Sequence, residues 1–374
     1  MNVGVLNESN KIENRAGLTP SSVSFLAEKG HQVYVQAGAG LKAGYTNEEY
    51  ENQGAKIVFT KEEVFGRSDV VLNISPLNQE ECDLVKKDQI LFGFHHLAIA
   101  KKALLEELLQ KNVIIIGYEI VQEQDEILPF IESLSEVAGQ MCLVISGQYL
   151  QTSQGGRGVI IGGVVTVPPA TAVIVGSGVL ARSAVKAMLG AGAHTIALGQ
   201  NMERLRELEE MTSGKVVTLI ASKYNLERMT KVADILIGAV LMPGEKAPLI
   251  ITRDMVKSMK KGSLIIDLAI DQGGCVETSR LTTLEHPVFV EEGITHYCVP
   301  NITSAVSRTS TKVLSNVVTP YLLQIGEVGI DRALKDNASL AQGVYAYKGA
   351  LTKKSIAERF GIVYKKLFQG KRES

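Results

Sequence analysis

The chain of 374 residues has no tryptophan, and aromatic residues make up only 5% of it. It also has little net charge, because 39 Lys and Arg oppose 40 Asp and Glu, which leaves a formal charge of −1. This balance excludes a bulk basic surface, so neither nucleic acid nor membrane is predicted as a partner. Proline is scarce at 10 residues, whereas glycine is abundant at 35. The 45% hydrophobic and 21% charged content is typical of a globular protein and not of a disordered chain.

Metal-site and targeting patterns are missing as well. The four cysteines, at positions 82, 142, 275 and 298, form neither a CxxC pair nor a Cys/His zinc spacing, so no metal is predicted. They are expected to be reduced and mostly buried, as in a cytoplasmic protein. The first 15 residues lack a basic segment followed by an apolar run, so no secretory signal is expected. The most apolar stretch, residues 159–175, is interrupted by glycine and proline pairs and does not predict a membrane span.

Short β-branched runs alternate with amphipathic helical patterns over most of the chain, which is typical of βαβ units with a parallel sheet. The first series predicts strands at residues 2–6, 31–35, 55–58, 70–74, 90–94 and 113–117, and helices at 21–29, 47–53 and 101–110. The second series predicts strands at residues 172–175, 195–198, 216–220, 235–237, 263–267 and 296–298.

Two long helical patterns bound the second series, at residues 133–151, where Ser135 is a candidate cap, and at residues 309–325. The predicted fold class is α/β, with two Rossmann-like domains that each contain a parallel sheet. A substrate domain is predicted from residues 1–133 and 308–374. A dinucleotide-binding domain, residues 134–307, is predicted to be inserted between these halves and linked to them by the long helices.

A glycine-rich turn, GSGVLA at residues 176–181, stands between an apolar strand and a helical pattern. It has the G-x-G-x-x-A form of dinucleotide-binding folds. Gly176 permits a tight turn and Gly178 lets the backbone approach a pyrophosphate. The helix start at Val179 and Leu180 offers unpaired N–H groups and the positive end of the helix dipole. The turn therefore predicts a bound dinucleotide.

The acidic residue that usually binds the adenosine ribose, about 20 positions further on, is missing. Gly199 stands there, followed by Gln200 and Asn201, with no carboxylate before Glu203 and no basic residue before Arg204. Two interpretations are open. The dinucleotide is held without this contact, or the choice between NAD and NADP is relaxed because no carboxylate repels a 2′-phosphate. NAD is the favoured cofactor of the two.

Several motifs stand in the order, and nearly at the spacing, of bacterial alanine dehydrogenase. They are RAGLTP at 15–20, GAG at 38–40, SEVAG at 135–139, GGRG at 155–158, GAVLMP at 238–243, AIDQGGCVET at 269–278, HYCV at 296–299 and RTST at 308–311. The chain thus resembles that family from residue 3 to about 361, as a divergent member. The resemblance implies reversible, NAD-dependent oxidative deamination of L-alanine to pyruvate and ammonium, and a homohexamer.

The resemblance also assigns roles to single residues. A lone Arg15 is normally a solvated surface residue, but the match implies that its guanidinium fork binds the substrate carboxylate. His96 follows the predicted strand at 90–94, and the match selects it over His95 as the group that exchanges the substrate proton. Asp271, which follows LIIDLAI and precedes two glycines, would orient water or ammonia.

Further contacts are implied by the resemblance alone. Glu119 is placed beside the substrate, Asn301 at the substrate or the nicotinamide amide, and Ser135 near the pyrophosphate. The dinucleotide would also contact Val240, Leu241, Leu268, Ile270 and Val299.

One departure from the family stands out. The family has a lysine in a pattern like KVKEP that touches the substrate, whereas residues 73–77 here are NISPL and no lysine occurs between Lys61 and Lys86. Ser75 is predicted to take that place, and losing a charged hydrogen bond costs about 1.5–3 kcal/mol.

Three interpretations of this departure are open. The protein is a weaker alanine dehydrogenase in which His95 supplies the donor, an imine or 2-oxo-acid reductase of the same fold with altered specificity, or a non-catalytic NAD(H)-binding protein. Retention of Arg15, His96 and Asp271 argues against the last.

Overall fold

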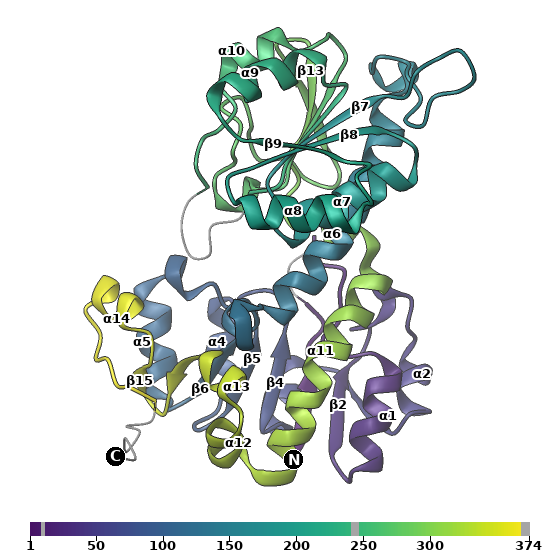
Figure 1. Ribbon diagram of the computed structural model, residues 1–374. Helices are drawn as coiled ribbons and strands as arrows, with labels where there is room; N and C mark the ends of the chain where they lie inside the picture. The colour runs from purple at the N-terminus through teal and green to yellow at the C-terminus, as the bar shows by residue number, and fades with distance from the viewer. Residues whose placement is uncertain (9–11, 241–246, 368–374) are drawn as a thin grey trace. The chain divides into compact units, whose positions relative to one another are not determined.

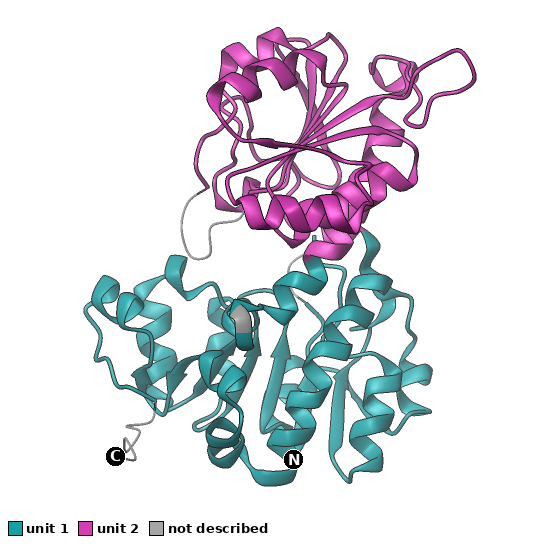
Figure 2. Ribbon diagram, in the orientation of Figure 1, with its two compact units in different colours: residues 1–134, 306–374 teal, residues 135–305 magenta. Residues whose placement is uncertain are grey.

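The computed structural model describes residues 1–8, 12–240 and 247–367 (Figure 1). The chain forms two compact units (Figure 2). Unit 1 consists of Met1–Leu134 and Val306–Ser374, and unit 2 of Ser135–Ala305. No helix in the described part of the chain has both the length and the apolar character needed to cross a membrane.

Unit 1 is built on an eight-stranded sheet with the order β15-β14-β6-β5-β4-β1-β2-β3. Its strands are β1 (Asn2–Val5), β2 (Gln32–Gln36), β3 (Ala55–Val58), β4 (Val70–Asn73), β5 (Ile90–Gly93), β6 (Ile114–Gly117), β14 (Val344–Tyr347) and β15 (Ala350–Leu351). The first six strands are parallel, and β14 and β15 add an antiparallel edge. The parallel part has the strand order of a Rossmann fold, which reverses between β1 and β4. Folds of this kind bind their ligands at the carboxyl ends of the strands, at this point of reversal.

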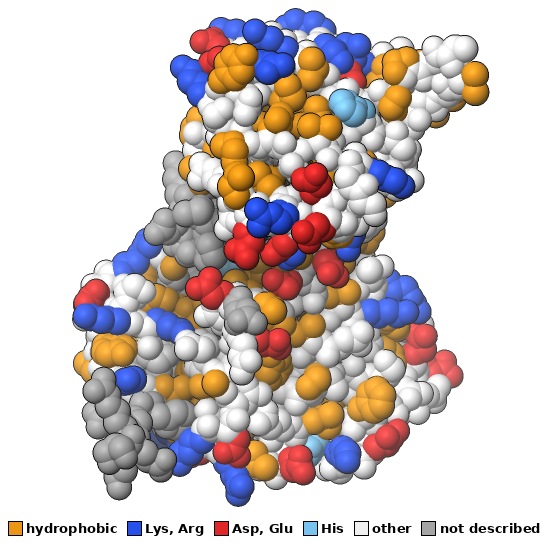
Figure 3. Space-filling view, in the orientation of Figure 1, with side chains coloured by type: hydrophobic (Ala, Val, Ile, Leu, Met, Phe, Trp, Pro, Cys, Tyr) orange, Lys and Arg blue, Asp and Glu red, His pale blue; other side chains and the backbone are white. Residues whose placement is uncertain are grey.

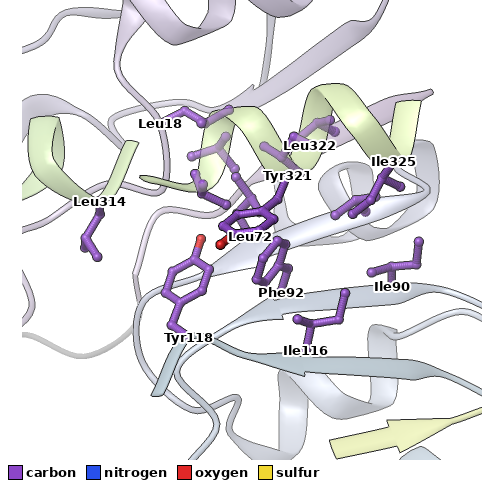
Figure 4. Packing of buried hydrophobic residues seen from close by; sticks show 14 of the residues in the cluster. Leu18, Leu72, Ile90, Phe92, Ile116, Tyr118, Leu314, Tyr321, Leu322 and Ile325 are labelled. Carbon is purple, nitrogen blue, oxygen red and sulfur yellow. The ribbon is translucent and has the colours of Figure 1, made fainter. Parts of the chain in front are cut away.

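Helices cover both faces of this sheet because alternate strand residues point to opposite sides. Its helices are α1 (Pro20–Glu28), α2 (Asn47–Glu51), α3 (Lys61–Arg67), α4 (Gln79–Leu84), α5 (Lys102–Gln110), α11 (Ser307–Val328), α12 (Ile330–Asp336), α13 (Ala338–Gln342) and α14 (Lys354–Phe360). On one face Leu72 and Phe92 belong to the same buried cluster as Tyr321 of α11 (Figure 4). On the other face Val71 and Leu91 belong to a cluster with residues of α3, α4, α5 and α14.

Unit 2 repeats this architecture with a seven-stranded sheet of order β12-β13-β11-β10-β7-β8-β9. Its strands are β7 (Thr171–Val175), β8 (His194–Gly199), β9 (Val217–Ile220), β10 (Ile235–Gly238), β11 (Leu264–Asp267), β12 (Val288–Glu291) and β13 (Ile294–Tyr297). Here β12 is the antiparallel strand, and the strand order reverses between β7 and β10. One face packs on α6 (Pro129–Tyr149), α7 (Val179–Gly190) and α8 (Met202–Met211), and the other on α9 (Lys223–Val232) and α10 (Arg253–Ser258).

The predicted cap at Ser135 is wrong. Helix α6 begins at Pro129, so Ser135 lies inside it. A proline at the first helical position has a suitable φ and lacks only an N–H that would be unpaired there in any case. The helix accordingly starts one turn earlier than the apolar pattern indicates.

Strands β12, β14 and β15 are not predicted from the sequence pattern. Both edge hairpins have two-residue turns, Glu292-Gly293 and Lys348-Gly349, and all four of these residues have positive φ. Such turns match the twist of paired strands, and an X-Gly pair supplies the conformation. These two dipeptides are the sequence signal by which the hairpins could have been predicted.

A long loop of unit 2, residues 155–170, projects from the unit (Figure 1). Apolar side chains are exposed on it (Figure 3), with Val165 at 91% exposure and Ile160, Val164 and Val167 above half. At its base Arg157 forms an ion pair with Asp234, with 3.0 Å between Nε and Oδ1. Thus the loop is anchored at one end and exposes its apolar residues beyond that point.

Candidate functional site

Four of the residues predicted to serve the substrate follow the carboxyl ends of parallel strands in unit 1, whereas Asp271 and Asn301 lie in unit 2. Arg15 lies in the loop after β1, Ser75 after β4, His96 after β5 and Glu119 after β6. Because these ends share one edge of the sheet, the fold brings the four positions to that edge, on both sides of the point between β1 and β4 where the strand order reverses.

Arg15 is buried and is held by a carboxylate that sequence reasoning missed. Its Nε and one terminal nitrogen each donate to a different oxygen of Glu13, both at 2.7 Å. The guanidinium lies 6.0 Å from the ring centroid of Phe94, and Lys42 Nζ donates to the Glu13 carbonyl at 3.0 Å. A bidentate, charge-assisted pair of this kind orients the arginine before any ligand binds. The only sequence signal for Glu13 was its position two residues before Arg15.

Glu8 links the loop after β1 to the loop after β4. Its two carboxylate oxygens accept hydrogen bonds from the backbone N–H groups of Ile74, at 2.6 Å, and Ser75, at 3.0 Å. Burial raises the pKa of Glu8 to about 7, although these two N–H groups oppose the shift. Glu8 therefore changes charge near neutral pH at the edge that carries Arg15.

Ser75 is half-buried, and its carbonyl accepts a hydrogen bond from Asn73 Nδ2 at 2.9 Å. The amide oxygen of Asn73 is buried and has no hydrogen-bond partner among the described residues. The hydroxyl of Ser75, which is predicted to take the place of the family's lysine, therefore lies two residues from a buried acceptor that is unsatisfied among the described residues.

His96 has a left-handed backbone, with φ 45° and ψ 43°, and its side chain is 49% exposed. Glu119 Oε1 accepts hydrogen bonds from the backbone N–H groups of His95, at 3.2 Å, and His96, at 2.6 Å, and lies 3.9 Å from His96 Nδ1. The same oxygen accepts a third bond from the Tyr345 hydroxyl of β14 at 3.0 Å. Burial raises the pKa of Tyr345 well above its usual value, so this hydroxyl remains a donor. Strand β14, which pairs with β6, thus helps to hold the His96 loop through Tyr345.

His95 points into the protein instead. It is 5% exposed, its Nε2 has no partner within the described part of the chain, and burial lowers its pKa to about 4. It is therefore neutral at pH 7. That His95 supplies the missing donor therefore stays a prediction, because a neutral imidazole keeps one N–H but brings no positive charge in place of a lysine.

In unit 2 the glycine turn has the geometry expected of a pyrophosphate cradle. Gly176 has φ 137°, and a Cβ there would lie 2.2 Å from the carbonyl oxygen of Ala239, after β10. A Cβ on Gly178 would meet no atom within 4 Å. No side chain caps the α7 N-terminus, which starts at Val179. The cradle is open at the helix N-terminus and closed on the sheet side, as a dinucleotide requires.

The loop that carries Asp271 is organised by a buried carboxylate, Asp267. This residue accepts hydrogen bonds from the backbone N–H groups of Ala269 (3.1 Å), Cys275 (3.0 Å) and Val276 (3.2 Å). Leu268 lies between Asp267 and Ala269, and Ile270 and Asp271 follow in a 3-10 turn (Ile270–Gln272). Asn301, which has φ 53°, donates its backbone N–H to Asp271 Oδ2 at 3.4 Å. Two predicted residues, Asp271 and Asn301, therefore meet, whereas Asp267 was missed because it reads as the end of an apolar strand.

Four further residues predicted at the dinucleotide, Gln200, Asn201, Val240 and Val299, follow the carboxyl ends of parallel strands in unit 2. Val240 follows β10, and Val299 is buried after β13. Gln200 is exposed, and Asn201 caps α8 by accepting the Arg204 N–H at 3.0 Å. Ser135 precedes Glu136, whose carbonyl accepts the hydroxyl of Ser183 in α7 at 2.6 Å. Leu241 lies outside the described residues. No group of three or more potential metal ligands was found where the structure is described.

The sequence and the fold of this chain match those of known proteins. Residues 4–138 match the family model "Alanine dehydrogenase/PNT, N-terminal domain", and residues 142–354 match its C-terminal counterpart. The chain belongs to the alanine dehydrogenase family. It is 41% identical to an alanine dehydrogenase of Methanococcus maripaludis, over 97% of this chain and 98% of the relative. It is 42% identical to one of Staphylococcus haemolyticus, over 97% of each.

A solved L-alanine dehydrogenase structure superposes with a TM-score of 0.92 at 37% identity, covering 96% of this chain and 99% of that one. Family membership confirms the resemblance inferred from the motifs and the predicted α/β class. It also confirms the predicted enzyme class, an NAD-dependent amino-acid dehydrogenase of the alanine dehydrogenase type.

Proposed function

We propose that this protein interconverts L-alanine, or a related small amino acid, with its 2-oxo acid and ammonium, using NAD(H). The observation that carries this proposal is the gathering of a pre-oriented Arg15 and a Glu119-anchored His96 at one sheet edge of unit 1. A guanidinium suits a substrate carboxylate, and an imidazole suits proton exchange near neutral pH.

In the proposed reaction the residues have separate roles. Unit 1 would hold the substrate, with Arg15 on the carboxylate and His96 exchanging the proton of the amine or carbonyl. Unit 2 would hold the dinucleotide at Gly176 and Gly178, and Asp271 would direct water or ammonia. When bound, the nicotinamide supplies or accepts a hydride at the substrate Cα. Glu119 acts by positioning His96.

A second candidate is a reductase of the same fold that acts on another 2-oxo acid or an imine. It is favoured by the loop at Ser75, which carries a hydroxyl and the unsatisfied Asn73 amide oxygen. A neutral loop would prefer a substrate that brings its own hydrogen-bond donor. The non-catalytic alternative is not proposed, because the Arg15 and His96 loops keep charged contacts that orient them.

We further propose that NADP(H) is accepted beside NAD(H), since Gly199 provides no carboxylate at the adenosine ribose. The homohexamer and the cytoplasmic location also stay predictions. All four cysteines are buried and free, which suits a reducing compartment. Light scattering coupled to size-exclusion chromatography tests the hexamer.

The deciding experiment is NADH oxidation with pyruvate and ammonium, run beside a panel of other 2-oxo acids and primary amines. Robust turnover of pyruvate at or above that of every other substrate supports the first candidate. Turnover of another oxo acid or imine with little pyruvate reduction supports the second. Absence of turnover with all substrates, together with NADH binding by calorimetry, would refute both.

A further inference from the structure

The backbone conformation of Gly199, the last residue of β8, does not require a glycine. Gly199 is absent from the residues with positive φ, so its backbone would accept any side chain. What excludes a side chain is Ser177 in the glycine turn. A Cβ on Gly199 would lie 2.9 Å from both Cβ and Oγ of Ser177, and 3.1 Å from Leu205 Cδ2. Carbon atoms pack at about 3.5–4.0 Å, so positions 177 and 199 compete for one space.

Ser177 cannot withdraw from this space easily, because the turn is bonded to β8. The N–H of Gly176 donates to the carbonyl of Leu198 at 2.7 Å, which continues the parallel register of β7 and β8. Ser177 is half-buried, and its hydroxyl has no hydrogen-bond partner among the described residues. The hydroxyl is therefore available at the corner where a dinucleotide fold places its ribose-binding carboxylate.

The charges around this corner favour an anion more than a carboxylate-lined site would. Arg204, in the first turn of α8, is exposed and has no ion pair within the described part of the chain. Glu203 is its acidic neighbour, and Arg182 of α7 is already paired with Glu207 at 3.2 Å. An arginine near this position is what accommodates a ribose 2′-phosphate in related folds.

We propose that Ser177 takes over the ribose contact of the excluded side chain at position 199, and that the two positions form one coupled determinant of cofactor choice. A hydroxyl accepts a bond from a ribose 2′-hydroxyl and donates one to a 2′-phosphate. The pair therefore admits both NAD(H) and NADP(H). This inference rests on the proposed binding of a dinucleotide at the glycine turn.

The test is a double-mutant cycle in binding, not activity. Calorimetry gives the Kd of NADH and of NADPH for the wild-type full chain, Gly199→Asp, Ser177→Gly and the double variant. The wild type is expected to bind both nucleotides within about 10-fold of each other. Gly199→Asp alone is expected to weaken both, because its Cβ displaces Ser177 and the turn. The double variant is expected to regain NADH and to disfavour NADPH by roughly 100-fold, since the carboxylate now fits and repels the phosphate.

Two further variants keep the test decisive if the aspartate variant folds poorly. Gly199→Ala adds only the methyl group, so it should weaken both nucleotides when Ser177 is present and have little effect when it is combined with Ser177→Gly. Gln200→Glu adds charge on an exposed neighbour, so its effect on NADPH should not depend on which side chain occupies position 177.

Three results bear on the inference differently. Tight NADH binding and NADPH rejection by Gly199→Asp alone would overturn the coupling. A wild type that prefers NADH by more than 100-fold would overturn the acceptance of a 2′-phosphate. Failure of the wild type to bind either nucleotide would refute the proposed function itself.

Discussion

Replacing Glu8 by glutamine should make stability less sensitive to pH. Glu8, after β1, accepts hydrogen bonds from the backbone N–H groups of Ile74 and Ser75, after β4. Burial raises its pKa from 4.5 to about 7, so the folded state holds this proton more strongly than the unfolded state. The contribution of Glu8 to the free energy of unfolding is then fully present below pH 4.5, declines as the pH rises to about 7, and stays constant above that. At about 1.4 kcal/mol for each pH unit, ionisation costs about 3 kcal/mol over this window.

Glu8→Gln removes the titration and keeps one oxygen that can accept an N–H. The mispaired amide costs about 1–3 kcal/mol at any pH, so the informative quantity is the change in the variant-minus-wild-type difference. The free energy of unfolding of the variant minus that of wild type should increase by about 3 kcal/mol between about pH 4.5 and about pH 8. Urea denaturation of both proteins across that range, followed by circular dichroism, measures it.

Glu63→Gln is a matched control of opposite sign. The backbone N–H of Phe59 is the main cause that lowers the pKa of Glu63, so this acid stabilises the fold above its unfolded pKa. Because this contribution changes only below the unfolded pKa of 4.5, the stability of the control relative to wild type should stay nearly constant from about pH 5 to about pH 8 and increase only at lower pH. A difference in the free energy of unfolding between Glu8→Gln and wild type that stayed constant, within about 1 kcal/mol, from about pH 4.5 to about pH 8 would refute the raised pKa of Glu8.

Three other substitutions test separate parts of the site. Tyr345→Phe removes one donor to the carboxylate that holds the histidine loop, and should lower kcat by roughly 10-fold with little change in KM for NADH, whereas Tyr347→Phe on the same strand should not. Ser75→Lys should raise pyruvate reduction by at least about 10-fold, since a charged donor at a reacting oxygen is worth that much or more. Gly176→Ala should abolish dinucleotide binding in calorimetry, because its Cβ would meet the Ala239 carbonyl at 2.2 Å.

Each of these has a result that counts against it. Equal losses in both tyrosine variants would show that Tyr345 acts only through general stability. An unchanged rate in the serine variant would count against the alignment of Ser75 with the family lysine. Normal nucleotide binding by the alanine variant would mean that the turn is not the cradle.

The positions of the parallel strands were readable from the sequence because short apolar, β-branched runs are bounded by polar turns, whereas the order of the strands in each sheet came from the structure. The edge hairpins at Glu292-Gly293 and Lys348-Gly349 were not, since their strands are short and partly exposed, and only the turn dipeptides mark them. The start of α6 was misplaced for a similar reason, because Pro129 and not the polar Ser135 begins the helix.

Within the candidate site, local motifs and the family resemblance pointed to the residues proposed to contact ligands, but not to the residues that support them. Glu13, Glu8, Asp267 and Tyr345 act through hydrogen bonds to residues that are near in space, in the case of Tyr345 226 positions away from Glu119. A single sequence has no periodicity that records such pairs, so these contacts could be found only from the structure.

The sequence by itself determined the family, the α/β class and the glycine turn, because motifs, strand runs and turn residues are local properties of the chain. Tertiary structure alone decided which histidine is available, since burial makes His95 neutral while a left-handed backbone exposes His96. The tertiary structure also decided two local features that the small net charge does not reveal. Ser177 fills the space that a side chain on Gly199 would need, and burial brings the charge of Glu8 under the control of pH. Both effects arise from the packing of distant segments, which no local pattern encodes.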